Sequence, residues 1–191
     1  MTSDQPLDLD LHHRMPLVPA APTATAIPRH VERFRTAYRA ENIGPRYSGK
    51  RHLATTSAIS LGLVGLTLSF VQAPSLAELA VVPLTFLFSN LTEYVGHRFP
   101  MHRPFRGLGL IYNRHSKQHH HFYTDEAMSY ESWRDVEMVL FPALLIVFFS
   151  VGFVAPAGLL VYMLTTANAA RLFMATVVSY FLLYEWLHFS Y

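Results

Sequence analysis

The chain consists of long apolar runs with few charged residues, separated by polar segments. The first two apolar runs cover about 53–71 and 76–95, and no charged residue occurs from 138 to 170. A last apolar stretch follows at 172–186. Because about 20 apolar residues are enough for a helix to cross the hydrocarbon core, the pattern predicts an all-α integral membrane protein. We expect four transmembrane helices arranged as two hairpins.

Proline and polar residues mark the turns between these helices. Residues 73–75 close the first hairpin, and Pro83 is expected to kink the second helix, which neighbouring helices tolerate in a membrane. The second block either turns near Pro156 or forms a longer kinked helix that turns near 168–171. Arg171 would be costly at the middle of the membrane, and both alternatives give four crossings.

The chain before the first apolar run has two parts. Residues 1–28 hold five of the 12 prolines and no sustained period, which predicts a disordered segment. From 29 to about 41, Val31, Phe34 and Tyr38 follow a helical spacing among arginines. This amphipathic helix either lies on an anionic bilayer surface or packs on a neighbouring domain. Residues 29–191 are expected to form one membrane domain.

Composition narrows the possible function classes. Of 191 residues, 51% are hydrophobic and 15% charged, against roughly 25% charged in typical globular chains. The absence of cysteine excludes disulfides, thiolate ligands and cysteine nucleophiles. A net charge of +2 gives no reason to expect a nucleic-acid partner. Histidine is the unusual residue, since seven of the 11 fall between positions 97 and 188.

The basic residues predict the sidedness of the chain. Of 15 Lys and Arg residues, eight lie in 1–51 and six in 98–134. The positive-inside rule places both segments, and with them the N-terminus, in the cytoplasm. Because two crossings separate 51 from 97 and two more separate 137 from 188, all seven histidines are expected at the cytoplasmic face.

The first histidine pair lies at the inner end of the second span. His97 and His102 are five residues apart, about 140° of rotation on a regular helix. Both can reach one metal only if the backbone bends, and Pro100 gives a reason for a bend. Glu93, four residues before His97, is a candidate acceptor for the second ring N–H of a ligating histidine. A structural salt bridge is the alternative for Glu93.

Four more histidines fall within 115–121. His115 and His119 are spaced i, i+4, which stacks them on one face of a helix. His120 points about 100° away, towards a second metal or the other side of the first. At the inner end of the last span, Glu185 and His188 form a third element. Imidazole suits iron, zinc and copper, and residue type alone does not choose among them. No catalytic residue can be assigned from the pattern.

The three elements have the spacings HxxxxH, HxxxHH and ExxH, in that order between paired spans. This series resembles the fatty acid hydroxylase/sterol desaturase superfamily, as do residues 123–128 (YTDEAM) and 140–142 (LFP). The likeness covers about residue 30 to the C-terminus. It implies a non-haem di-iron oxygenase that hydroxylates or desaturates a lipid C–H bond, using O2 and an electron-donor protein.

The resemblance also implies roles for individual residues. Two iron ions, with zinc as a possible substitute, would be held by six histidines: His97, His102, His115, His119, His120 and His188. His121 fits less well and is expected outside the ligand set, with Glu93 and Glu185 as supporting groups. The family continues with a further histidine and another histidine cluster beyond the ExxH element. The resemblance therefore implies a chain truncated at its C-terminus, and it leaves open whether the 191-residue chain binds metal and is active.

Other readings of the histidines stay open at this point. The main alternative is a membrane protein that binds or transports metal ions without oxygenase activity. Transport usually needs ionisable ligands near the bilayer midplane, whereas these histidines gather at one end. A b-type cytochrome would need facing histidines inside the bundle. A structural protein with a solvated histidine loop would need three clusters on one face by chance.

Overall fold

The structure, a computed structural model that describes residues 27–190, has only helices as regular elements in that range and no β-strand. Four helices in it are long and apolar enough to cross a membrane. The all-α prediction and the number of candidate spans are therefore confirmed, while the two-hairpin arrangement and the sidedness stay predictions. The spans are α2 (Gly49–Ser69), Leu76–Met101 with α3 (Leu76–Leu79) and α4 (Val81–Gly96), Leu145–Leu164 with α8 (Leu145–Phe149) and α9 (Ala155–Leu164), and α10 (Ala167–Ser190).

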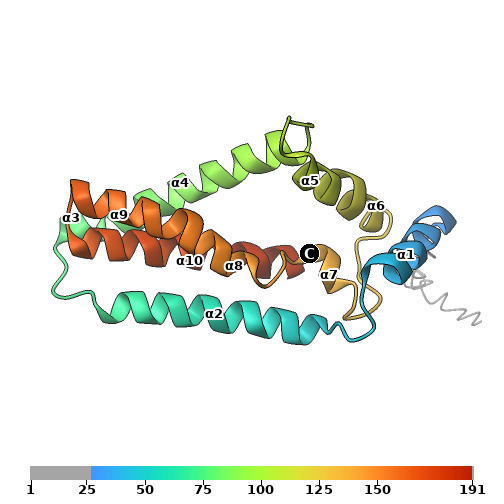
Figure 1. Ribbon diagram of the computed structural model, residues 1–191, viewed down its shortest axis with the longest axis horizontal. Helices are drawn as coiled ribbons and strands as arrows, with labels where there is room; N and C mark the ends of the chain where they lie inside the picture. Colours follow the sequence, from blue (N-terminus) through green and yellow to red (C-terminus); the bar gives the residue numbers. More distant parts are fainter. Residues whose placement is uncertain (1–26, 191) are drawn as a thin grey trace, which may run out of the picture.

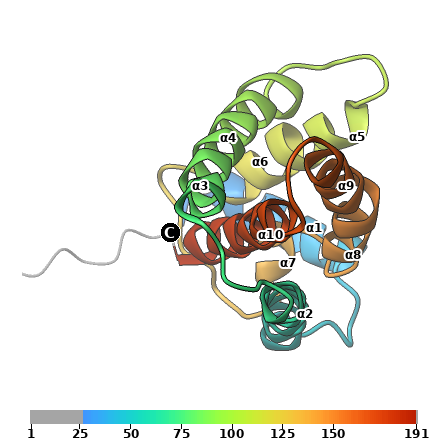
Figure 2. The ribbon, with the colours of Figure 1, turned by 90° about the vertical axis from the view of Figure 1, so that its left-hand side faces the viewer.

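Helix α10 is the centre of the bundle. It packs against α2, α4 and α9, and the end-on view shows it between them (Figure 2). Small residues of α10, including Ala169, Ala170 and Ala175, are buried and allow this close approach. Leucines of α4 such as Leu84 and Leu87 stay exposed, each at 65%. Exposed apolar side chains along a span are what lipid contact requires.

The far turns of the bundle settle one alternative left open by the sequence. The chain turns at residues 165–166, between α9 and α10, and it does not turn at Pro156. Arg171 lies in the first turns of α10, where its guanidinium donates to the Phe70 carbonyl at 2.7 Å. Asn168 also bonds the backbone of Gln72 in both directions, at 2.8 and 3.2 Å. Arg171 therefore lies at a helix end and not at mid-membrane.

Three segments of the described chain are π-helical: η1 (His97–Met101), η2 (Asn113–His119) and η3 (Ser150–Val154). In a π-helix the N–H bonds the carbonyl five residues back, so the turn is wider. Pro100 lies inside η1 and Pro156 follows η3, and proline has no N–H to bond the residue four back. In a widened turn, the N–H of the residue after the proline bonds the carbonyl that the proline cannot bond. The bend expected at Pro100 is therefore a local widening of the helix.

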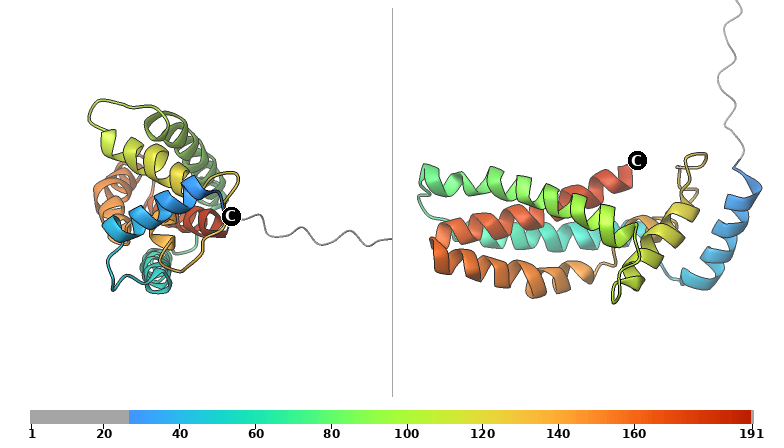
Figure 3. Two further views of the ribbon diagram at one scale, coloured as in Figure 1. Left: turned by 90° about the vertical axis from the view of Figure 1, so that its right-hand side faces the viewer. Right: turned by 90° about the horizontal axis from the view of Figure 1, so that it is seen from above.

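A polar region extends the bundle beyond one end. It consists of α5 (Gly109–Tyr112), η2 and α6 (His120–Phe122) as one stretch, followed by α7 (Val136–Val139). Helix α1 (Arg29–Asn42) packs against α6 at the extremity of the molecule (Figures 1 and 3). Val31 and Tyr38 of α1 are buried, so its apolar face packs on the chain itself. The predicted disorder of 1–28 falls almost wholly outside the described residues.

Candidate metal centre

The first histidine pair lies on the π-turn η1. The ring centroids of His97 and His102 are 4.7 Å apart. A rotation of about 140° applies to a regular helix, whereas residues five apart come nearly into line where the hydrogen bonds run i→i+5. The widened turn therefore brings both rings to the same side, with no kink out of the helix axis.

His115 and His120 form a second pair that also lies on a widened turn. His115 and His120 are also five residues apart, on η2 and its first following residue, and their Nε2 atoms lie 3.2 Å apart. His115 Nε2 is 3.1 Å from His97 Nε2. One ligand nitrogen from each of His97, His102, His115 and His120 falls within 4.8 Å of the others. We call these four residues the histidine quartet.

His119 and His188 form a second pair beside the quartet. The rings of His115 and His119 do stack, as expected for i, i+4 spacing, with centroids 5.3 Å apart. His119 nevertheless points its Nε2 towards His188 Nε2, at 3.4 Å. Its Nδ1 lies 3.1 Å from the carbonyl of Met138. Donation of Nδ1–H to this carbonyl leaves the Nε2 lone pair free, which is the usual outer support of a metal-binding histidine.

The ring nitrogens meet as metal ligands do. A ring nitrogen has one in-plane position for either a proton or a lone pair, so His115 Nε2 cannot form good hydrogen bonds to two rings at once. Bonds of about 2.0–2.1 Å to one ion place neighbouring ligand nitrogens about 2.9–3.4 Å apart. The separations of 3.1 and 3.2 Å fall in this range. The residues present therefore fit a metal ion.

Electrostatics favour the form of histidine that binds metal. Burial, together with the neighbouring rings of His119 and His120, lowers the pKa of His115 to about 3. Burial and the nearby His188 lower the pKa of His119 to about 4, and burial and His119 lower the pKa of His120 to about 4. All three rings are neutral at pH 7. Neutral imidazole is the ligand, so no proton has to leave these rings before binding.

The expected supporting residues lie elsewhere. Glu93 accepts a hydrogen bond from the Tyr180 hydroxyl at 2.6 Å. Within residues 27–190, Glu93 forms no hydrogen bond to a histidine. Glu185 is buried at 1% exposure beside the backbone N–H of Phe141, 3.4 Å away. His121 packs on Phe34, with ring centroids 5.7 Å apart, away from the quartet. The backbone between Glu93 and His97 is regular, since the His97 N–H bonds the Glu93 carbonyl, but the Glu93 carboxylate bonds Tyr180 instead of a histidine.

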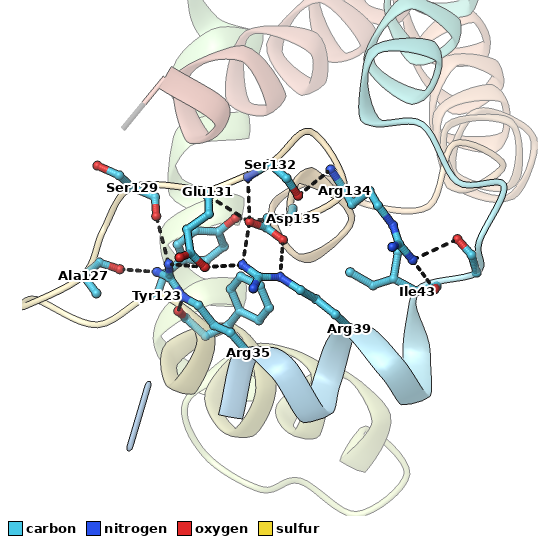
Figure 4. A network of polar contacts seen from close by, with 12 residues as sticks. Arg35, Arg39, Ile43, Tyr123, Ala127, Ser129, Glu131, Ser132, Arg134 and Asp135 are labelled. Carbon is cyan, nitrogen blue, oxygen red and sulfur yellow. Dashed lines mark hydrogen bonds and ion pairs between the residues drawn. The ribbon is translucent and has the colours of Figure 1, made fainter. Parts of the chain in front are cut away.

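A buried arginine holds the segment that follows the second cluster. Arg35 of α1 is fully buried and donates to the carbonyls of Phe122, Ala127 and Ser129 at 2.8, 2.6 and 3.2 Å (Figure 4). Phe122 is the last residue of α6, and the other two acceptors belong to the loop directly after it. Because the loop carbonyls have few other partners, the guanidinium fixes its path. The stretch that carries the histidines is thereby attached to α1.

A second ionic contact closes the same loop. Arg39 pairs with Asp135 through Nε at 2.8 Å and also bonds Glu131 (Figure 4). Asp135 accepts further bonds from the backbone N–H groups of Glu131 and Ser132. Burial alone would raise the pKa of Asp135, but these bonds and the Arg39 charge lower it overall. The carboxylate is therefore ionised at neutral pH and completes the attachment of α1.

One arginine side chain links the π-helical segment η2 to two other helices. Arg114, the residue before His115, donates to the Tyr38 hydroxyl at 2.8 Å. It also donates to the carbonyl of Glu137 at 2.6 Å and to its carboxylate at 3.1 Å. These bonds connect η2 to both α1 and α7. The rigid setting of η2 comes from such contacts, which preorganise a metal site.

Sequence reasoning missed the structural roles of Arg35, Arg114 and Asp135. For Arg35 a signal was present, because it follows Val31 by four residues and precedes Tyr38 by three. It therefore lies on the apolar stripe of α1 and not on its basic face. For Arg114 and Asp135 the partners are distant in sequence, and no local pattern indicates them.

An apolar cavity of about 450 Å³ reaches the quartet from within the bundle. It lies between α4, α10 and the segment η3–α9, and its wall includes His97 and Met101 at one end. Most of the other lining side chains are aromatic or aliphatic, namely Phe88, Phe141, Phe149, Phe153, Val154, Phe173, Val177 and Phe181. An apolar compound in this cavity would contact the wall formed by His97.

Comparison of the chain with protein-family models, with curated proteins and with solved structures finds no match. The histidine spacings and the geometry therefore carry the functional argument alone.

Proposed function

We propose that this protein is a membrane-embedded oxygenase that hydroxylates or desaturates a C–H bond of a lipid, with iron held by the histidine quartet and by His119 and His188. The observation that carries the proposal is the meeting of the quartet and the apolar cavity at His97. A metal site that borders an apolar cavity brings a hydrocarbon within reach of the metal. The spacing of the three histidine elements supports the same proposal.

The chemistry balances with one external reductant. In hydroxylation, one oxygen atom of O2 enters the C–H bond and the other becomes water, with two electrons and two protons supplied from outside. In desaturation, two hydrogens leave the lipid and O2 becomes two waters with the same external electrons. Iron bound to histidines would supply O2 activation. The electrons come from a separate donor protein.

The chain's own residues would position the substrate and keep water out. The aromatic walls of the cavity bind the hydrocarbon and exclude water from the reacting carbon. Met138 and Arg114 hold the second histidine segment in place through the contacts described above. The distribution of basic residues supports a cytoplasmic position for this end of the bundle, where a soluble electron donor has access.

A metal transporter is the alternative that the sequence left open. A transport path needs polar or ionisable groups along the bundle. The cavity that leads from the quartet into the bundle is lined mainly by phenylalanine and aliphatic side chains. This lining favours a hydrocarbon over a cation.

The test is metal content together with lipid oxidation. The protein is purified in detergent from cells supplied with iron, and metal per chain is measured by elemental analysis. His115→Ala removes the ring whose Nε2 lies 3.1 Å from His97 Nε2 and 3.2 Å from His120 Nε2, so we expect metal affinity to fall by more than the ~10–100-fold typical of outer-shell changes. The matched control is His121→Ala, which removes a neighbouring histidine that packs on Phe34.

Two results would contradict the proposal. Equal metal content in His115→Ala and the parent protein would show that the quartet is not a ligand set. Metal-loaded protein that consumes no O2 with reductant and membrane lipids, in the presence of a ferredoxin-type donor and a cytochrome-type donor, would exclude the oxygenase reaction. Iron-dependent formation of an alcohol or alkene in the lipid would support it.

A further inference from the structure

The apolar cavity contains one polar pair in its wall. Glu93 of α4 and Tyr180 of α10 both line it, and the Tyr180 hydroxyl donates to Glu93 Oε2 at 2.6 Å. The same hydroxyl accepts a bond from the side-chain amide of Asn90 at 3.2 Å. The ring of Phe86 packs edge-on against Tyr180, with centroids 5.3 Å apart. The pair is therefore held in position from two helices.

A carboxylate within a membrane span is costly and usually marks a function. Tyr180 satisfies only one oxygen of Glu93, and Oε1 has no hydrogen-bond partner among residues 27–190. No Lys or Arg forms an ion pair with Glu93 in the same range. Stabilising the helix packing through Tyr180 needs only one of the two oxygens. The second oxygen is available to a compound in the cavity.

The chemistry of this oxygen selects its partner. A carboxylate oxygen only accepts hydrogen bonds, so the group that meets it must be a donor. A fatty acid carboxylate would be repelled by the like charge in a surrounding of low dielectric. A lipid ammonium would lose its hydration on entry, which is far more costly than for a neutral hydroxyl. A neutral alcohol fits best.

We propose that Glu93 and Tyr180 select a lipid that carries a hydroxyl group, with that hydroxyl donating to Glu93. This inference rests on the proposed function, whose substrate class it names. Glu93 lies four residues before His97, a rise of about 6 Å along the helix. The hydroxyl is therefore bound about one helical turn from the oxidised end of the cavity, with the hydrocarbon along the phenylalanines.

The experiment measures binding to the metal-free protein, so it does not depend on oxygenase activity. Radiolabelled hexadecanol is bound to detergent-purified protein and displaced by unlabelled hexadecanol, hexadecyl methyl ether, hexadecanoate or hexadecylamine. The ether keeps the oxygen but cannot donate. Since hydrogen bonds to charged groups are strong, we expect the alcohol to bind about tenfold or more tightly than the ether. Hexadecanoate should compete least.

Two variants and a matched control locate the effect. Glu93→Leu should remove the preference for alcohol over ether, because no acceptor remains. Glu93→Gln keeps an acceptor but loses the charge, so alcohol binding should persist while hexadecanoate competes better. Glu78→Gln changes a carboxylate at the other end of the same span, where it bonds Ser75 and Thr166. It should leave all four affinities unchanged.

Several outcomes would overturn the inference. These are equal binding of alcohol and ether by the parent protein, a tenfold preference for hexadecylamine, or an unchanged alcohol preference in Glu93→Leu. Each is separate from the failure of the proposed function, which would appear as missing metal or missing oxidation while the alcohol preference remains. If Glu93→Leu does not fold, the change in competition by hexadecanoate between the parent protein and Glu93→Gln still tests the inference.

Discussion

The two ends of the helical bundle are built in different ways. At the far end, short turns at 70–75 and 165–166 are joined by bonds between exposed or partly exposed groups, such as Asn168 with Gln72. At the histidine end, the long segment between η1 and α8 folds into a region with buried charges and six converging histidines. Short connections join the helices at the far end, whereas the long segment carries four of the six candidate metal ligands. Substitutions at the two ends should therefore differ in size.

The largest effect on folding is expected at the buried ion pair of the histidine end. Asp135→Asn removes a charge that Arg39 and two backbone N–H groups stabilise. Loss of one partner of a buried pair costs about 3–5 kcal/mol, and the lower value applies because Arg39 is partly exposed. Amide hydrogen exchange at 122–135 should speed up accordingly. Asp125→Asn, an exposed change in the same loop, is the control.

The same pair predicts a dependence on acid. The pKa of Asp135 is lowered in the folded protein, so its stabilising effect is fully present above the unfolded value of about 3.9 and lost as pH falls below it. Protection against exchange at 122–135, measured relative to the intrinsic exchange rate at each pH, should therefore fall on acidification in the parent protein. The difference between parent and Asp135→Asn should shrink as the pH falls through the lowered pKa of Asp135. A constant difference across that pH range would exclude the ionised carboxylate as the cause.

The next effect tests the widened turn at the first histidine pair. Pro100→Ala restores an N–H and allows a regular helix, which would rotate His97 and His102 about 140° apart. We expect metal affinity to fall by about 10–100-fold, as for other losses of ligand orientation. Pro156→Ala makes the same change next to η3, which carries no histidine, and should leave metal affinity intact. Competition with a chelator measures both.

A smaller effect is expected where α2 meets the polar region. A Cβ on Gly49 would lie 2.1 Å from the carbonyl oxygen of Trp133 and 2.8 Å from Val136. Because a backbone atom must move, Gly49→Ala should destabilise this contact by about 1–2 kcal/mol. Gly62→Ala on the same helix meets nothing within 4 Å and should be neutral or slightly stabilising. Thermal unfolding in detergent compares them, and equal melting temperatures would contradict the close contact.

The smallest effect belongs to the far end. Asn168→Ala removes two hydrogen bonds to the Gln72 backbone that are open to solvent or lipid headgroups. Such bonds contribute roughly 0.5–1.5 kcal/mol each in protected settings and less where water can replace them. We expect a shift in melting temperature close to the error of measurement, with metal content unchanged. A loss of metal would show that the far end is coupled to the quartet.

The four spans could be predicted from the sequence because apolar runs of about 20 residues are typical of transmembrane helices. Helix bounds were less accurate. Helix α2 begins at Gly49, before the apolar run, since Ser48 caps it and Lys50 and Arg51 lie in its first turn. Charged residues mark the end of the apolar run, whereas the helix itself extends past them. The helix predicted at 29–41 is confirmed as α1. It could be predicted because its apolar residues recur at regular helical spacing.

The candidate site was predicted in membership more than in geometry. All six expected histidines lie together, because four apolar spans of similar length return the chain to the same end. The rotations of about 140° and 100° were those of a regular helix and do not apply, because the chain is π-helical at both clusters. The repeated spacing of five, in His97 with His102 and in His115 with His120, was the available signal. The burial of Arg35 could have been predicted from its place on the apolar stripe of α1, whereas its partners in the loop are distant in sequence and have no local pattern.

The central position of α10 has a consequence for how the protein is made. The chain emerges from the ribosome in order, so α2, α4 and α9 are synthesised while the helix that all three contact is still absent. The quartet is complete in sequence by residue 120, but the partner of His119 arrives only at residue 188. The cavity wall formed by Tyr180 and Phe181 arrives equally late. Metal capture during synthesis would therefore precede the assembly of the hydrocarbon site, and insertion of α10 sets the moment at which the two meet.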